Sequence, residues 1–161
     1  MIRLSFRRLV APVLLLGALF AALPAAAIEV REVTSPGGIT AWLVEEHDIP
    51  FTALEIRFRG GTSLDAQGKR GAINLMTATL EEGSGDYDSQ GFAAAQQALA
   101  AGFSFDVDDD ALSVSARMLS DNRDKAVELL RGALTDPHFD QASLDRVRGQ
   151  VLSILAANAR D

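Results

Sequence analysis

The sequence has 161 residues, with 15 Lys and Arg against 22 Asp and Glu, a formal net charge of −7 and no cysteine. An acidic chain without a basic cluster is a poor nucleic-acid binder, because Lys and Arg must replace the counterions of the phosphates. Without cysteine the chain has neither disulfides nor a thiol nucleophile, so core burial or a partner must stabilise it.

The first 27 residues are typical of a secretory signal peptide. Arg3, Arg7 and Arg8 precede the uncharged run 9–23, and small residues stand at positions −3 and −1 of a cut after Ala27. Its removal would leave 134 residues with 12 basic and 22 acidic side chains, a net charge of −10. We therefore expect a periplasmic or secreted protein without a later membrane span, because no other apolar run approaches the roughly 18 residues a span needs.

The next part of the chain changes from strand to helix periodicity. Apolar and polar residues alternate in 28–33, 39–44 and 51–58, which predicts an opening meander of two or three strands. Apolar residues then recur at helical spacing, which predicts helices over 72–82 and 92–102, each ended by glycine.

The last third of the chain repeats this order. Alternation in 103–107 and 111–118 predicts a hairpin, and two helices follow, capped by Asp121 and Asp140. The predicted core stripes of these helices are Val127, Leu130 and Leu134 in the first, and Leu144, Val147, Val151 and Ile154 in the second. The fold class is therefore α+β, a largely antiparallel sheet covered by helices. Because the last helix is still running at Asp161, we expect a domain over 28–161 that is incomplete at its C-terminus.

Motifs for metal or phosphate binding are incomplete. Asp106, Asp108 and Asp110 stand at positions 1, 3 and 5 of a calcium loop, but Ala111 and Arg117 occupy the places of the required glycine and glutamate. An acidic hairpin turn is the better interpretation of these three residues.

The remaining candidate groups are equally weak. Gly68-Lys69 resembles a phosphate loop, but Arg70 stands where Ser or Thr must hold magnesium. The only two histidines, His47 and His138, are 91 residues apart in turns, whereas metal sites usually present local pairs. Residue chemistry alone therefore supports no catalytic constellation.

Several segments together resemble one family. Residues 49–71 include Gly60-Gly61-Thr62-Ser63-Leu64-Asp65 and Gly68-Lys69-Arg70-Gly71. This run resembles the start of the pitrilysin (insulinase-type) zinc metallopeptidase family, in which a strand leads through such a loop into the active-site helix. Later segments resemble the family in the same order: Gly83-Ser84, 99–102, 119–130 and 136–146. The similarity covers 29–158 and implies the family's α+β N-terminal domain.

The family's zinc motif is replaced in this sequence. The family helix carries H-x-x-E-H, in which two histidines bind zinc and the glutamate is the general base, and a later helix supplies a third ligand. The resemblance places the histidines at Asn74 and Ala78, the general base at Thr77 and the third ligand at Ile154. It therefore implies a degenerate, non-catalytic member without catalytic, cofactor-binding or metal-ligating residues. We expect Ala78 and Ile154 to fill the space of the zinc and its ligands.

The resemblance also implies a cellular role. We expect a non-catalytic subunit of the bacterial envelope that partners an active pitrilysin-type zinc metallopeptidase in peptide or protein degradation, with zinc only in that partner. The charge of −10 would favour basic peptides or a basic partner face. Two alternatives remain: an active zinc metalloendopeptidase with an atypical site, using residues such as His47, Glu81 and Glu82, and a standalone periplasmic binding or scaffold domain.

Overall fold

The computed structural model describes residues 28–158, which form two compact units, 28–47 and 48–158. The predicted signal peptide, 1–27, lies outside the described residues. Among the described helices, none is long and apolar enough to cross a membrane.

The first unit is a two-stranded antiparallel hairpin of β1 (Val30–Thr34) and β2 (Thr40–Val44). Ser35 closes its turn, because its hydroxyl accepts the N–H of Ile39 at 3.1 Å and its own N–H bonds the Ile39 carbonyl at 2.8 Å. The strands bury little surface, and Trp42 is 81% exposed. A two-stranded hairpin of this kind is marginally stable by itself.

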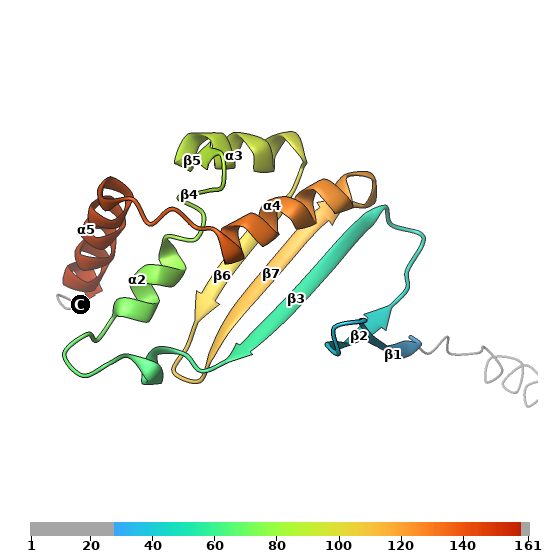
Figure 1. The fold of residues 1–161 in the computed structure, drawn as a ribbon, viewed down its shortest axis with the longest axis horizontal. Helices are drawn as coiled ribbons and strands as arrows, with labels where there is room; N and C mark the ends of the chain where they lie inside the picture. Colours follow the sequence, from blue (N-terminus) through green and yellow to red (C-terminus); the bar gives the residue numbers. More distant parts are fainter. Residues whose placement is uncertain (1–27, 159–161) are drawn as a thin grey trace, which may run out of the picture. The chain divides into compact units, whose positions relative to one another are not determined.

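The second unit contains a three-stranded antiparallel sheet in the order β3-β7-β6 (Figure 1). Its strands are β3 (Phe51–Arg59), β6 (Gly102–Val107) and β7 (Ala111–Leu119). The predicted meander is therefore wrong for its third strand, which pairs with β7 and not with β2. At this register Leu54 lies opposite Ala116, and Ile56 lies opposite Val114, so the apolar faces of both strands coincide.

The helix α4 packs on the apolar face of this sheet. Val114, Ala116 and Met118 of β7 are buried there against Ala126 and Leu130 of α4 (Arg123–Thr135). Figure 1 shows α4 lying over the strands. The opposite face is mostly polar, with Phe51 and Leu119 exposed at one end, so the period-2 alternation of the sequence largely separates core from solvent.

A second core cluster joins α3 (Ser89–Ala98) to α4. Phe92 of α3 is fully buried with Leu129 and Ala133, and its ring meets Phe103 of β6 with centroids 6.3 Å apart. The buried face of α4 consists of Ala126, Leu129, Leu130 and Ala133. The predicted stripe is thus rotated, since Val127 is exposed and Leu134 only half-buried.

Several predicted helix boundaries change. The predicted helix over 92–102 is α3, which begins at Ser89 and ends at Ala98, and Gly102 begins β6. α2 (Ala72–Ala78) ends four residues early, because the Thr79 hydroxyl bonds the carbonyl groups of Leu75 and Met76 and the chain turns away. Asp121 does not cap α4, but lies in the short 3₁₀ turn η2 (Ser120–Asn122) that precedes it.

Three further elements complete the second unit. β4 (Gly83–Ser84) and β5 (Tyr87–Asp88) pair with each other, and the Asp88 carboxylate caps α3 by accepting the Gly91 N–H at 2.7 Å. α5 (Gln141–Asn158) begins directly after Asp140, as predicted. Only Val147 of its predicted stripe is fully buried. Four α-helices and antiparallel strands in the described residues confirm the α+β prediction.

The two faces of α4 predict different mutational costs. Leu130→Ala removes a buried side chain and leaves a cavity, so we expect a loss of about 2–5 kcal/mol in the free energy of unfolding. Val127→Ala, one turn away on the exposed side, is expected to cost about 0.5 kcal/mol or less. Urea unfolding followed by circular dichroism measures both, and equal losses would contradict the observed orientation of α4.

Candidate functional site

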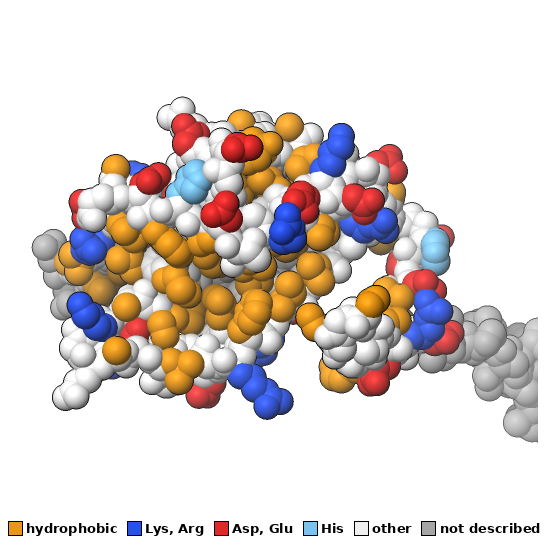
Figure 2. All heavy atoms as spheres, in the orientation of Figure 1, with side chains coloured by type: hydrophobic (Ala, Val, Ile, Leu, Met, Phe, Trp, Pro, Cys, Tyr) orange, Lys and Arg blue, Asp and Glu red, His pale blue; other side chains and the backbone are white. Residues whose placement is uncertain are grey.

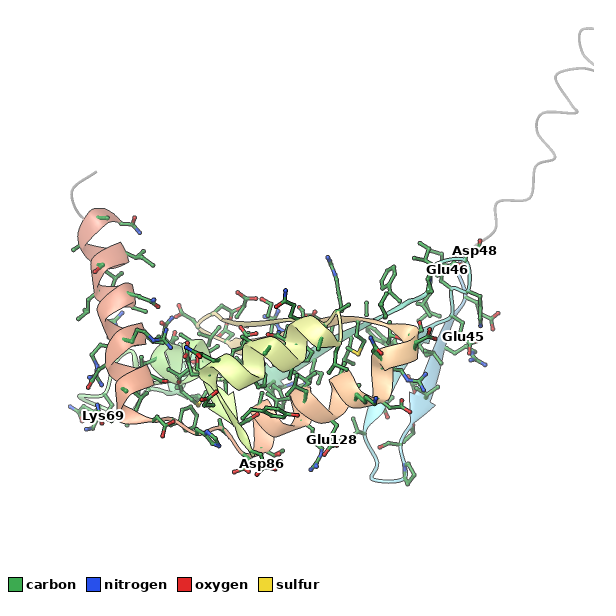
Figure 3. The ribbon with its side chains drawn as sticks, turned by 90° about the horizontal axis from the view of Figure 1, so that it is seen from above. Glu45, Glu46, Asp48, Lys69, Asp86 and Glu128 are labelled. Carbon is green, nitrogen blue, oxygen red and sulfur yellow. The ribbon has the colours of Figure 1, made fainter. Side chains whose placement is uncertain are left out.

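A groove of about 1180 Å³ lies between the loop that precedes α2 and the last helix, α5. The loop includes the 3₁₀ turn η1 (Thr62–Leu64), and Figure 3 shows Lys69 of this loop beside α5. The groove is lined by Thr62, Ser63, 65–72, Asn74, Leu75, Asp109, Arg148, Val151, Leu152, Ile154 and Leu155. The lining combines charged loop residues with an apolar helix face.

The acidic hairpin turn between β6 and β7 holds the start of this loop. The carbonyl oxygens of Asp108 and Asp110 accept the N–H groups of Thr62 at 2.9 Å and Gly60 at 2.6 Å. The Thr62 hydroxyl donates to the Asp109 carboxylate at 2.6 Å. A Cβ atom on Gly61 would collide with the Asp108 carbonyl, so glycine is required for this close approach.

The Asp108 carboxylate is used inside the turn. It accepts the N–H groups of Asp110 and Ala111, both at 2.8 Å, and pairs with Arg57 at 3.1 Å. The two backbone N–H groups are the main reason that the pKa of Asp108 is lowered. These contacts show that the aspartates form a hairpin turn that holds the loop before α2. This agrees with the interpretation of the acidic residues as a hairpin turn in the sequence.

Asp65 connects the loop to α2. Its two carboxylate oxygens accept the N–H of Gly71 at 2.6 Å and the N–H of Ile73 at 3.0 Å. Gly71, which precedes the helix, has φ +91° and offers no side-chain cap. Asp65 therefore satisfies the free N–H groups at the start of α2 from six to eight residues away. The bonds from Ile73 and then Gly71 lower the pKa of Asp65.

The structure brings together two of the four positions that the family comparison identified. Asn74 of α2 and Ile154 of α5 line the same groove, although they are far apart in the sequence. Thr77 is buried, and its hydroxyl donates to the Ile73 carbonyl at 2.9 Å, one helical turn back. Ala78 is exposed at the last residue of α2 and does not line the groove.

The expected filling of the zinc space by apolar side chains is wrong. Ile154 is 60% exposed, and Ala78 is also exposed. Ile154 lines the open groove that α5 and α2 leave between them, whereas Ala78 is exposed outside that groove. Of the four positions, only that of Thr77 is buried.

The residues present do not fit a zinc ion. Asn74 offers only a neutral amide, Ala78 and Ile154 offer no donor atom, and zinc sites require nitrogen, thiolate or carboxylate ligands. Within residues 28–158, no group of three or more His, Asp and Glu side chains is placed to hold a metal.

Of the three side chains in the atypical-site alternative, Glu81 and Glu82 have structural partners, and His47 belongs to the first unit. Glu82 pairs with Arg146 of α5 and accepts a bond from Ser89 at 2.9 Å. Glu81 accepts a bond from Gln96 at 3.0 Å, and burial raises the pKa of Glu81. These contacts tie the end of α2 to α3 and α5, which is a structural role.

His138 holds the segment after α4 against the turn between β4 and β5. Its ring Nε2 bonds the Gly85 carbonyl at 2.7 Å, and its backbone N–H bonds the Gly83 carbonyl at 3.0 Å. Sequence reasoning treated it as an ordinary loop residue, because contact with a turn 53 residues away leaves no local signal.

Sequence reasoning also missed the charge of the groove. Lys69, Arg70 and Arg148 all line it, although Lys69 and Arg70 were considered only as parts of a failed phosphate loop and of the segment that resembles the family. The signal that could have found them is the presence of two consecutive basic residues in the loop that the family places before its active-site helix.

The fold resembles that of a peptidase M16 inactive domain, and the sequence is similar to that of a non-peptidase homologue. The chain is 29% identical over 148 residues to the non-peptidase homolog YmxG of Helicobacter pylori, a match that spans 92% of this chain and 34% of that protein. The solved peptidase M16 inactive domain from Pseudomonas fluorescens superposes with a TM-score of 0.72 and 29% identity over 78% of this chain and 31% of that one.

A third similarity concerns the fold alone. A protease from Helicobacter pylori gives a TM-score of 0.64 at 14% identity, over 78% of this chain and 30% of that chain. No family model matches the sequence. The chain spans about a third of the length of these relatives. The names of the two relatives at 29% identity confirm the predicted degenerate member that is not catalytic by itself.

The Asp65 cap predicts a pH-dependent stability. Because the pKa of Asp65 is lowered from 3.8 in the folded chain, the charged carboxylate stabilises the fold above about pH 4, and this contribution is lost as the pH falls through the folded value. Asp65→Asn should therefore lower the free energy of unfolding at pH 7, and the difference from wild type should shrink below pH 4.

Asp86→Asn provides the control, because Asp86 is an exposed carboxylate in the turn between β4 and β5 (Figure 3). Urea unfolding at a series of pH values should show little change for this variant. A loss for Asp65→Asn that is the same at pH 3 and pH 7 would contradict the assigned role of the charge.

Proposed function

We propose that the chain acts as the non-catalytic subunit of a peptidase complex in the bacterial envelope, beside an active zinc metallopeptidase of the same family. Zinc and the hydrolytic step belong to that partner. The observation that carries this proposal is the lining of the groove, where Asn74 and Ile154 occupy two positions at which the family resemblance places zinc ligands.

The position of the general base supports the loss of chemistry in this chain. Thr77 is 4% exposed and its hydroxyl is satisfied by the Ile73 carbonyl. A carboxylate at this position would have to be buried without a metal or a cation to compensate it, which is costly. At the position where the family resemblance places the general base, α2 therefore holds a buried residue, Thr77.

The exposed apolar surface of the second unit supports assembly with a partner. Figure 2 shows apolar side chains gathered over the sheet, beside α4. Phe58 at the end of β3 is 44% exposed, and Leu54 and Ile56 in the same row are half-buried. Contiguous apolar surface of this kind is typical of contact sites. The sequence of 1–27 supports placing the assembly in the envelope.

The test compares the chain alone with the chain mixed with an active pitrilysin-type subunit from the same genome. We expect the purified chain to retain far less than one zinc per molecule after dialysis and to cleave no casein or peptide substrate. The mixture should co-elute in size-exclusion chromatography and cleave peptides faster than the active subunit alone. A mixture made with an active subunit whose general-base glutamate is replaced by glutamine should show no cleavage.

Two results would overturn the proposal. Stoichiometric zinc together with peptidase activity in the isolated chain would establish an enzyme with an atypical site. Failure to bind the active subunit, with its activity unchanged, would leave a standalone binding or scaffold domain. The variant Asn74→His/Ala78→His controls for detection, because a histidine pair at i, i+4 on α2 should raise zinc retention.

A further inference from the structure

Strand β3 forms one edge of the three-stranded sheet (Figure 1). It pairs with β7 over nine residues, and among the described strands it has no neighbour on its other side. An unpaired edge of this length exposes a row of backbone N–H and carbonyl groups, to which another strand can add. Natural sheets often protect such an edge with a bulge or a proline. The register of β3 with β7 is unbroken from Phe51 to Arg59, and this stretch contains no proline.

Two hydrogen bonds at the ends of β3 show which backbone groups face the free edge. The Ser120 N–H donates to the Pro50 carbonyl at 3.1 Å, and the Gly60 N–H donates to the Asp110 carbonyl at 2.6 Å. Hydrogen-bonded and non-bonded pairs alternate along an antiparallel ladder, so the even-numbered residues between these ends bond to β7. The odd-numbered residues turn their N–H and carbonyl groups to the free edge, and they are Phe51, Ala53, Glu55, Arg57 and Arg59.

The side chains of β3 separate into a charged row and an apolar row. Glu55 and Arg57 are exposed on the polar face of the sheet. Leu54 and Ile56 are half-buried against the core on the other face, and Phe58 in the same row is 44% exposed. The edge therefore presents an acidic residue and, two positions later, a basic one, above a continuous apolar row.

A second, antiparallel copy of β3 matches this edge when Ile56 lies on the twofold axis. Glu55 then lies opposite Arg57 of the second copy, and the reciprocal pair forms as well. Leu54 lies opposite Phe58 of the second copy on the apolar face, and the odd-numbered residues meet as hydrogen-bonded pairs. Centring the pairing on Glu55 or on Arg57 instead would place two like charges opposite each other, which is destabilising. The charges thus favour one register of β3 with itself.

The present partners of the two charged side chains are compatible with this pairing. Glu55 accepts a bond from the Ser115 hydroxyl at 2.5 Å, and Arg57 pairs with Asp108 at 3.1 Å. A carboxylate has two acceptor oxygens and a guanidinium has several donors, so each can keep its present contact while it binds across the edge. The Arg57 side chain is 63% exposed and is therefore accessible to a second chain.

We propose that two copies of this chain dimerise through the free edges of β3, in the antiparallel register with Ile56 on the twofold axis. The two three-stranded sheets then continue as one sheet across an isologous interface. The pairing uses the edge of the sheet, so the apolar face beside α4 (Figure 2) stays available to the partner of the proposed function. The inference does not rest on that function.

Cysteine variants test the register, because the sequence contains no cysteine of its own. Ile56→Cys should form an intermolecular disulfide under mild oxidation, since non-hydrogen-bonded cross-strand pairs have Cα atoms about 4.5 Å apart, within disulfide range. Leu54→Cys is the matched control in the same half-buried row. Its thiol faces Phe58 of the second copy, and the two thiols are separated by about 13 Å along the strand. Non-reducing electrophoresis should therefore show a cross-linked dimer for Ile56→Cys alone.

Charge variants test the pairing by analytical ultracentrifugation, in which the wild-type chain should form a reversible dimer. Glu55→Arg and Arg57→Glu each place like charges opposite each other twice, so each should weaken the dimer by about tenfold. Combining the two substitutions in one chain, or mixing the two single variants, should restore association. Glu128→Arg changes the net charge equally but lies on the exposed side of α4 (Figure 3), and it should have little effect. Circular dichroism shows whether the variants are folded.

Four results would overturn the inference. These are a wild-type chain that stays monomeric at about 100 μM, equal cross-linking of Ile56→Cys and Leu54→Cys, equal effects of Glu55→Arg and Glu128→Arg, and no restoration by the combined charge exchange. A chain that is monomeric alone but loses its binding to the active subunit in Glu55→Arg would assign this edge to that subunit. A dimer that does not bind the active subunit would retain this inference and lose only the proposed function.

Discussion

The close approach of the Asp108 carbonyl to Gly61 fixes the geometry on which the groove depends. The β6–β7 turn bonds the backbone of Gly60 and Thr62, and this attachment holds the loop that contains Asp65. Asp65 in turn satisfies the N–H groups at the start of α2. Because α2 has only seven residues, it would be marginal without this external cap and its packing. The placement of Asn74 thus depends on a series of hydrogen bonds that begins at the β6–β7 turn and continues through Asp65 to the start of α2.

The same hydrogen bonds explain how α2 can keep its position without the side chains of a zinc motif. The contacts that position α2 involve the loop and the turn, and none of them uses the side chains at positions 74, 77 or 78. Changes at those positions would therefore leave these contacts intact. Thr77 is a buried helix residue whose hydroxyl bonds the Ile73 carbonyl, whereas Asn74 and Ile154 line an open groove. A fold and its activity are separable here because different residues carry them.

The alternation and helical spacing of the sequence were sufficient to predict the α+β class, the β6–β7 hairpin and all four helices. They could not predict that β3 pairs with β7, since the register depends on apolar faces that meet only in three dimensions. Helix ends were less accurate, because Thr79 ends α2 and Asp88 caps α3 through contacts that compete with simple periodicity. The buried face of α4 differs from the predicted stripe because small residues, Ala126 and Ala133, provide the close contacts.

The family resemblance predicts that four positions replace the zinc ligands and the general base, and the structure places two of them, Asn74 and Ile154, on the same groove. The open groove and its basic residues depend on how α5 lies against the loop, which local sequence does not specify. Calorimetric titration of the chain and of Asn74→Ala with zinc tests the central claim most directly. The account predicts no stoichiometric binding by either protein, whereas one zinc bound tightly by the wild type and lost in Asn74→Ala would contradict it.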